Sequence, residues 1–196
     1  MSIAGAIILL VGDSWMTGPA GAALADAMRA EGATVVVDGV VGRSANSLVG
    51  NLRTLLDEVG TVQPTHVVIV LGVNDTVGQR THDSYVTLRS AIESAGPEVW
   101  ILSNATMPDS TYRTKVQAIE VMQRDVFGSH AIAGATFADA TWFDSTGYHL
   151  TPTAAPAWVA LVEPMLARMI DGQSGTLSKV GRALLKTLPF ADRFFS

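Results

Sequence analysis

A continuous apolar run followed by a polar turn lies near the start of the sequence, AIILLVGDS at residues 6–14. Every residue from Ala6 to Val11 is apolar, without the alternation of a strand that has one face in water. This pattern is typical of a strand that is covered on both faces. Gly12-Asp13-Ser14 then gives a turn signal. The stretch therefore predicts a buried parallel strand that ends in a turn before a helix.

The rest of the chain repeats this order of strand and helix. Similar apolar runs predict strands at Thr34–Val37, His66–Leu71 and Glu98–Ser103, and a short fifth strand at Ala131–Ala133. Helices are predicted at 20–30, 47–59, 83–94 and 110–127, with a last one after Thr151-Pro152 that bends near Pro164. The alternation predicts an α/β fold with helices on both faces of a mostly parallel five-stranded sheet.

The composition is that of a globular protein and excludes several functions. Of 196 residues, 48% are hydrophobic and 16% are charged, which suits one domain with a buried core. The net charge of −5 argues against a general nucleic-acid binder but leaves small anionic substrates open. Without cysteine there is no disulfide, thiolate zinc site or cysteine nucleophile. Because no cluster has metal-ligand spacing, neither a metal nor another cofactor is expected.

Two segments raise the question of location and partners. No Lys or Arg precedes the apolar run that begins at Ile3, so we interpret it as a strand and expect no signal peptide, a cytoplasmic location by default, and no transmembrane segment. Residues 1–171 are predicted to form the domain and residues 172–196 a linker and tail. Residues 176–196 read as a basic amphipathic helix that docks on a protein or a membrane surface, or packs against its own domain.

Polar motifs follow the predicted strands, at the edge where sites form in parallel sheets. Ser14 can project a hydroxyl into a cleft with its own N–H near a helix start, as a nucleophile beside an oxyanion site requires. Gly42 leaves room for a backbone N–H to approach a ligand, and the Asn74 amide can donate to an oxyanion. His149, just before the last helix, can reach Ser14 and take its proton. Each motif alone is also common turn or loop chemistry.

The motifs together resemble the four sequence blocks of the SGNH (GDSL-type) hydrolases, which are Gly12-Asp13-Ser14, Gly42, Gly72-Val73-Asn74-Asp75 and His149-Leu150-Thr151-Pro152. The resemblance spans residues 6–170 and implies a flavodoxin-like three-layer α/β/α fold. It implies that Ser14 is the nucleophile and His149 the base, with an oxyanion hole formed by the Ser14 and Gly42 N–H groups and the Asn74 side chain. The stretch from Gly42 to Ala45 further resembles the carbohydrate acetylesterase branch.

The sequence departs from this family at the residue that orients the histidine. The family places an Asp three residues before the histidine, where this chain has Thr146. Asp144 lies five residues before His149, and Asp139 lies further upstream. Either Asp144 orients the imidazole, or a backbone carbonyl or water does so in a dyad. Loss of the carboxylate is expected to lower the rate without abolishing catalysis.

Two functions follow from these observations. The first is a serine esterase that hydrolyses a short-chain, acetyl-type ester, such as an acetylated carbohydrate, through an acyl-enzyme. The second is an SGNH scaffold with weakened chemistry that acts as a binding or assembly module through its tail. Gly-x-Gly-x-x-Gly and Gly-x-x-x-x-Gly-Lys-[Ser/Thr] nucleotide motifs are missing, as is the Gly-x-Ser-x-Gly elbow of α/β-hydrolases.

Overall fold

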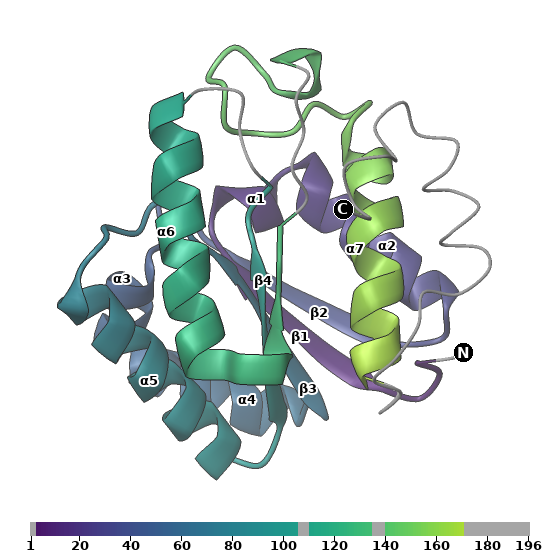
Figure 1. Ribbon diagram of the computed structural model, residues 1–196. Helices are drawn as coiled ribbons and strands as arrows, with labels where there is room; N and C mark the ends of the chain where they lie inside the picture. Colours follow the sequence, from purple (N-terminus) through teal and green to yellow (C-terminus); the bar gives the residue numbers. More distant parts are fainter. Residues whose placement is uncertain (1–2, 106–109, 135–139, 171–196) are drawn as a thin grey trace.

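Five parallel strands form a single sheet in the order β2-β1-β3-β4-β5. They are β1 (Ile7–Gly12), β2 (Thr34–Gly39), β3 (His66–Leu71), β4 (Glu98–Ser103) and β5 (Ala131–Ile132). This is the strand order of flavodoxin-like folds. The structure is a computed structural model that describes residues 3–105, 110–134 and 140–170 (Figure 1).

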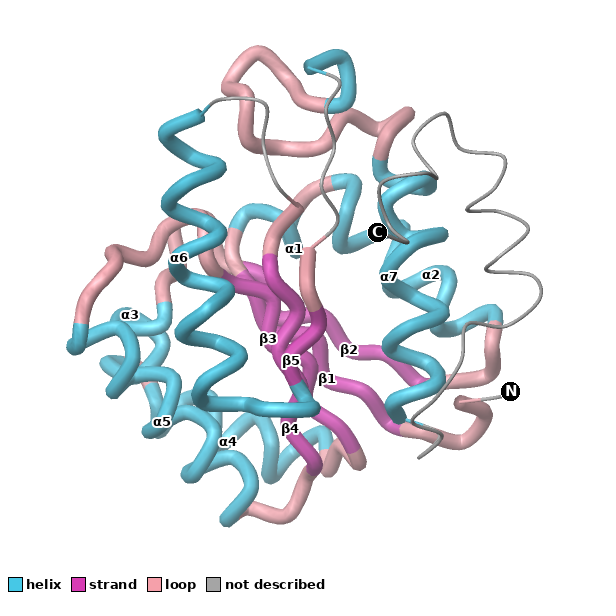
Figure 2. Tube along the Cα trace, in the orientation of Figure 1, coloured by secondary structure: helices cyan, strands magenta, loops and turns pink. Residues whose placement is uncertain are grey.

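Helices cover both faces of the sheet, so the fold has three layers, as the sequence predicted (Figure 2). On one face lie α1 (Ser14–Thr17), α2 (Pro19–Ala30) and α7 (Ala155–Ile170). The other face packs against α3 (Ala45–Gly50), α4 (Leu52–Val62), α5 (Gln79–Ser94) and α6 (Ser110–Phe127). Two short 3₁₀ turns, at Gly128–His130 and Ala140–Trp142, complete the described elements.

The central strand β1 explains why the apolar run does not alternate with polar residues. Ile8 and Leu10 belong to the core on the α2 and α7 side, whereas Leu9 and Val11 belong to the core on the α3 to α6 side. All four side chains are fully buried. A strand with helices on both faces needs apolar residues at every position.

Strands β1, β2 and β3 end at nearly the same height in the sheet, just before the site motifs begin. Gly12 at the end of β1 pairs with Gly39 of β2 and with Val70 of β3. The segments that follow these three strands therefore leave the sheet at one edge. This register brings the Ser14, Gly42 and Asn74 motifs to the same end of the fold.

One predicted helix is wrong in detail. The sequence predicted a single helix over residues 47–59, but the chain forms α3 and α4 with a break at Asn51. Asn51 has φ −113° and ψ 23°, outside helical values, and it ends one helix and precedes the next. The preceding Gly50 also has low helix propensity. Helix α4 then passes through Gly60, the predicted stop, and ends at Val62, before Gln63, which adopts a left-handed conformation.

The other boundaries differ by a few residues, and some predictions fall outside the described residues. Helix α5 begins at Gln79 rather than at residue 83, and α7 begins at Ala155 rather than directly after Pro152. The tail at 172–196 and Asp139 lie outside the described residues, so the domain boundary stays a prediction. Within the described ranges, every helix is too short or too polar to cross a bilayer.

Candidate active site

The nucleophile candidate stands at the first position of α1, directly after the turn that ends β1. Asp13 caps this helix, because its Oδ1 accepts a hydrogen bond from the Trp15 N–H at 2.9 Å. Gly12 permits the tight path, since a Cβ there would lie 2.3 Å from Met16 Cγ and 2.8 Å from Val70 O. Ser14 is therefore held half-buried at the carboxyl edge of the sheet.

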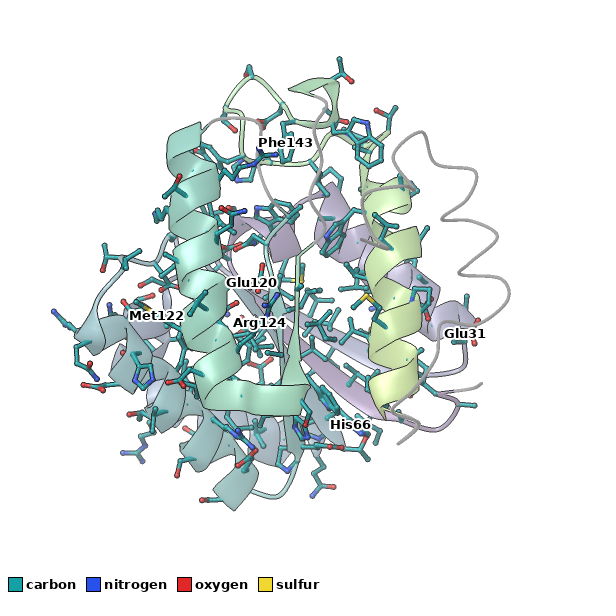
Figure 3. The ribbon with its side chains drawn as sticks, viewed as in Figure 1. Glu31, His66, Glu120, Met122, Arg124 and Phe143 are labelled. Atoms are coloured by element: carbon teal, nitrogen blue, oxygen red, sulfur yellow. The ribbon has the colours of Figure 1, made fainter. Side chains whose placement is uncertain are left out.

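A tight hairpin carries the base candidate. Its arms pair at Phe143 and Leu150, and the Asp144 N–H donates to the His149 carbonyl at 2.9 Å. Gly147 supplies the positive φ of +74° in the turn. In Figure 3 the hairpin residue Phe143 lies at one end of the sheet and His66 lies at the opposite end. The hairpin therefore holds His149 over the carboxyl edge of the strands.

The two side chains meet although they are far apart in the sequence. Ser14 Oγ lies 2.7 Å from His149 Nε2, which is hydrogen-bond distance. When Nδ1 carries the imidazole proton, Nε2 accepts the hydrogen of the serine hydroxyl. This is the contact through which an imidazole can remove the proton of a serine nucleophile.

Asp144 and Thr146 both approach the other imidazole nitrogen. His149 Nδ1 is 3.4 Å from Asp144 Oδ2 and 3.3 Å from Thr146 Oγ1. The Thr146 hydroxyl also hydrogen-bonds Asp144 Oδ1, and its N–H donates to the same oxygen at 2.9 Å. Burial alone would raise the pKa of Asp144, but the bonds from Thr146 and the nearby His149 together lower it. Asp144 thus lies beside His149 as a carboxylate, with Thr146 contacting both.

Gly42 occupies a tight turn in the exposed loop after β2. The Arg43 N–H donates to the Val40 carbonyl at 3.1 Å, which makes Gly42 the third residue of the turn. Its φ of +77° is the conformation that favours glycine at this position of a type II turn. The Arg43 guanidinium is turned to Asp38, with contacts of 2.7 and 3.0 Å to the carboxylate.

Asn74 reaches the same place from the end of β3. Its Nδ2 donates to the Arg43 carbonyl and to Asp13 Oδ2, each at 3.2 Å. The structure therefore brings Asn74 next to the Gly42 turn and next to the residue that precedes Ser14. Both amide hydrogens already have acceptors, so the amide must share or exchange one of these bonds to bind an oxyanion.

Asp13 is an ionisable group of this site to which the sequence motifs assign no role. Its side chain is fully buried. Desolvation by burial, aided by the charge of Asp75, raises the pKa of Asp13 to about 7, although the bonds from Trp15 and Asn74 act in the opposite direction. The folded protein therefore binds a proton at Asp13 that the unfolded chain has already released above pH 4.

This pKa predicts that Asp13 makes stability depend on pH. Between pH 4 and 7 the folded state holds the proton on Asp13 and the unfolded state does not. The contribution of Asp13 to the free energy of unfolding therefore falls as pH rises through this window, and it levels off above pH 7. A rise from 3.8 to about 7 corresponds to at most roughly 4 kcal/mol. Asp13→Asn should flatten the free energy of unfolding across this window, as urea denaturation at pH 4.5 to 8 would measure.

Asp26→Asn is the matched control, because Asp26 is an exposed carboxylate on α2. It should keep the pH dependence of the wild type. Asp75, Glu58 and Glu120 also have pKa values raised by burial, but they are present in all three proteins and cancel in the comparison. Equal slopes for the wild type and Asp13→Asn would contradict the assignment.

An apolar cavity of about 370 Å³ opens beside Ser14 and His149. Its apolar walls come from the starts of α1 and α2, from the loop after β2, and from the hairpin and the residues that follow it. They are Trp15, Pro19, Ala20, Val41, Leu150 and Pro152. Thr17 and Thr151 add hydroxyl groups. An uncharged group of a substrate can therefore lie against an apolar surface beside the Ser14 hydroxyl.

The other histidines and a larger cavity lie elsewhere. His66 contacts Glu98 at 3.3 Å, and His130 stacks on Trp100 with ring centroids 4.0 Å apart. His82 pairs with Asp125 at 2.9 Å in a surface cavity of about 550 Å³ between α5 and α6. Size alone would favour that cavity, but within its described lining His82 Nε2 contacts Asp125 and the Ser94 hydroxyl donates to the Ser90 carbonyl, so Ser14 and His149 stay the candidate site. In the described part of the chain, no three His, Asp or Glu side chains form a group that could hold a metal ion.

Solved structures with this fold include several esterases. LAE5, an alpha/beta hydrolase enzyme from the metagenome of Lake Arreo, Spain, is 12% identical with a TM-score of 0.64, covering 90% of this chain and 99% of its own. Esterase EstA from Pseudoalteromonas sp. is 17% identical with a TM-score of 0.64, covering 84% of this chain and 98% of its own. The acetylxylan esterase Axe2 from Geobacillus stearothermophilus is 14% identical with a TM-score of 0.63, covering 90% of this chain and 98% of its own.

These structural similarities show that the chain shares its fold with these proteins. The sequence identities are too low to show a shared activity. No protein-family model and no curated protein sequence matches this chain. The three-layer fold expected from the SGNH resemblance is confirmed.

Proposed function

We propose that this protein is a serine esterase of the SGNH hydrolase kind, with Ser14 as nucleophile and His149 as general base. The observation that carries the proposal is the 2.7 Å contact between Ser14 Oγ and His149 Nε2. A hydroxyl at a helix start, beside an imidazole and open to a cavity, has the surroundings that nucleophilic catalysis needs. The fold that the chain shares with EstA and Axe2 supports the same reaction class.

The proposed reaction has two halves. His149 Nε2 takes the proton of Ser14 as Oγ attacks the ester carbonyl carbon, and the imidazolium then gives this proton to the alcohol oxygen as the ester C–O bond breaks. The acyl group is left on Ser14. Water, deprotonated by the same nitrogen, attacks the acyl carbon, and the acid leaves as the proton returns to Ser14.

Asp144 serves as the orienting carboxylate in this proposal. It lies 3.4 Å from Nδ1, and Thr146, which contacts both side chains, occupies the place where the family has its aspartate. The carboxylate favours the tautomer with a proton on Nδ1 and stabilises the imidazolium. Because Asp144 is exposed, water weakens this effect.

The oxyanion is proposed to bind the N–H groups of Ser14 and Gly42 and the amide of Asn74. Support comes from the contacts that place Asn74 beside both the Gly42 turn and Asp13. The negative charge of the tetrahedral intermediate is a stronger acceptor than the Arg43 carbonyl, so one amide hydrogen can move to it. The bond to Asp13 then keeps the amide aimed.

The proposed substrate is a short-chain ester, with an acetylated carbohydrate as the first candidate. An acetyl group fits easily in the 370 Å³ cavity beside Ser14. Axe2, which has the same fold, is described as an acetylxylan esterase and as an acetyl-xylooligosaccharide esterase. Tyr148, beside His149 and 5.4 Å from Tyr112 between ring centroids, offers an aromatic surface on which a sugar could stack.

A screen of acetylated xylo-oligosaccharides and p-nitrophenyl esters of two to eight carbons tests this function. We expect hydrolysis of the acetyl esters by the wild type and no hydrolysis by Ser14→Ala. Folded wild-type protein that hydrolyses none of these esters would contradict the proposal. Hydrolysis of p-nitrophenyl esters but of no acetylated sugar would support the esterase activity and contradict an acetylated carbohydrate as the substrate.

Replacing Asn74 by alanine tests the oxyanion site. We expect kcat to fall about 100- to 1,000-fold, as for other oxyanion donors. KM should change little, because the bond strengthens mainly in the transition state. Asn51→Ala is the control, since Asn51 is exposed between α3 and α4, and it should keep kcat within about twofold. A kcat for Asn74→Ala close to that of the wild type would remove Asn74 from the oxyanion site.

A further inference from the structure

A series of buried hydrogen bonds lies behind the proposed oxyanion site and begins at Asp75, the residue after Asn74. Asp75 is fully buried. Its Oδ1 accepts from the Ala45 N–H at 2.7 Å, and its Oδ2 accepts from the Tyr85 hydroxyl at 2.5 Å. One carboxylate therefore links the turn after β3 to the first residue of α3 and to α5.

Tyr85 is held firmly in the position from which it donates to Asp75. Its side chain is fully buried, and its ring packs edge-on against Phe127 with centroids 6.1 Å apart. The Tyr85 oxygen accepts from Gln123 Nε2 at 2.9 Å. Burial and the nearby charge of Asp75 raise the pKa of Tyr85 well above its usual value, so the hydroxyl keeps its proton.

Gln123 connects this pair to two strand ends. Its Nε2 also donates to the Leu71 carbonyl at 2.9 Å, and its Oε1 accepts from Ser103 Oγ at 2.6 Å. Gln123 is fully buried and Ser103 nearly so. Each polar side chain in the series has hydrogen-bond partners, which is the condition under which a buried polar network stiffens a structure.

Two of the proposed oxyanion donors, the Gly42 N–H and the Asn74 amide, depend on Asp75 for their relative position. The bond from Asp75 to the Ala45 N–H fixes the start of α3, and with it the preceding loop that contains Gly42 and Arg43. Asn74 precedes Asp75 in the chain and donates to the Arg43 carbonyl at 3.2 Å. A shift of Asp75 would therefore move Asn74 and the Gly42 loop relative to each other.

We propose that Tyr85 is a positioning residue for the oxyanion donors, since its hydroxyl holds Asp75 and Asp75 holds the Gly42 loop in place against Asn74. This inference rests on the proposed esterase function. Tyr85 acts through Asp75 and not on the substrate. Because preorganised donors must be aimed at the oxyanion to within a fraction of an ångström, a small displacement is expected to cost rate.

The variant Tyr85→Phe removes the hydroxyl and keeps the buried ring. Asp75 Oδ2 loses a charge-assisted bond, and we expect kcat for p-nitrophenyl acetate to fall about tenfold. KM is expected to stay within twofold, because the ground-state ester makes little use of the oxyanion donors. Thermal unfolding of the same sample measures the loss of stability separately.

Ser84→Ala is the matched control. Ser84 is also buried on α5, and its hydroxyl donates to Asn46 Oδ1 of α3 at 2.7 Å, so its loss removes a partly buried bond from the same helix that does not involve Asp75. We expect it to lower the unfolding temperature by a similar amount and to keep kcat within twofold. A fall in kcat equal to that of Tyr85→Phe would mean that the loss of any bond from α5 has the same effect, which would overturn the inference.

A double-mutant cycle with Asn74→Ala separates positioning from general loosening. If Tyr85 acts through the oxyanion donors, Tyr85→Phe should cost at most about threefold when Asn74 is already alanine. The full tenfold cost in both backgrounds would contradict the inference. If Tyr85→Phe does not fold, Gln123→Met, which removes the donor to Tyr85, should show the same dependence on Asn74 with a fall of about threefold.

The failure of the inference and the failure of the proposed function give different results. If the wild type is active and Tyr85→Phe keeps the full kcat, the positioning role of Tyr85 is contradicted and the proposed esterase function stands. Folded wild type without turnover of any ester removes the esterase, and the role of Tyr85 with it.

Discussion

Replacing Ser14 by alanine should lower kcat/KM for p-nitrophenyl acetate by at least about 10⁴-fold, the largest single effect expected in this protein. The hydroxyl forms the bond to the acyl carbon, and Ser14 Oγ is 2.7 Å from His149 Nε2, the nitrogen proposed to activate it. Alanine leaves neither a nucleophile nor an acyl acceptor. The remaining activity would come from the oxyanion donors acting on water.

The fold should tolerate this change, because Ser14 is the first residue of α1 and its cap comes from Asp13. The free energy of unfolding should stay within about 1 kcal/mol of the wild type. Ser94→Ala, an exposed serine at the end of α5, is the control and should keep full activity. A Ser14→Ala variant that hydrolyses the ester as fast as the wild type would end the assignment of the nucleophile.

Replacing His149 by alanine should have an effect of similar size, a fall in kcat/KM of at least about 10⁴-fold. Without the imidazole, the proton of Ser14 has no acceptor at Nε2 and the leaving alcohol receives none. The double variant Ser14→Ala/His149→Ala should be no slower than either single variant, because the two residues act as one unit. Multiplied losses in the double variant would show that they act independently.

Asp144→Ala provides a graded comparison for the same unit. Asp144 is exposed and its Oδ2 lies 3.4 Å from Nδ1, so its contribution should be smaller than that of His149. A fall in kcat of roughly 10- to 100-fold is expected for a partly screened orienting carboxylate. Unchanged kcat would leave His149 oriented without a carboxylate, as in a dyad.

The fold could be predicted because each strand has a simple sequence signature. The run from Ala6 to Val11 is apolar at every position, and both faces of β1 are indeed buried. Helix breaks were harder to predict. The apolar spacing over residues 47–59 is continuous, and only the backbone of Asn51 shows that it serves two helices.

The site could be predicted only in part, because sequence order gives positions along the chain and not contacts. Ser14 and His149 could be chosen from their places beside strand and helix ends. The bond between Asn74 and Asp13, 61 residues apart, depends on the register of β1 and β3. Tyr85 gives no signal at all in the sequence, because a buried tyrosine on an amphipathic helix looks like any core residue.

Covalent labelling of Ser14 tests the central claim most directly. The protein is incubated with a fluorophosphonate, which reacts with activated serines, and the modified residue is located by mass spectrometry of its peptides. We predict one phosphonyl group per chain, attached to Ser14 in the wild type, absent in Ser14→Ala and formed much more slowly in His149→Ala. Folded wild-type protein that stays unlabelled, or that is labelled equally well without Ser14, would contradict the proposed site.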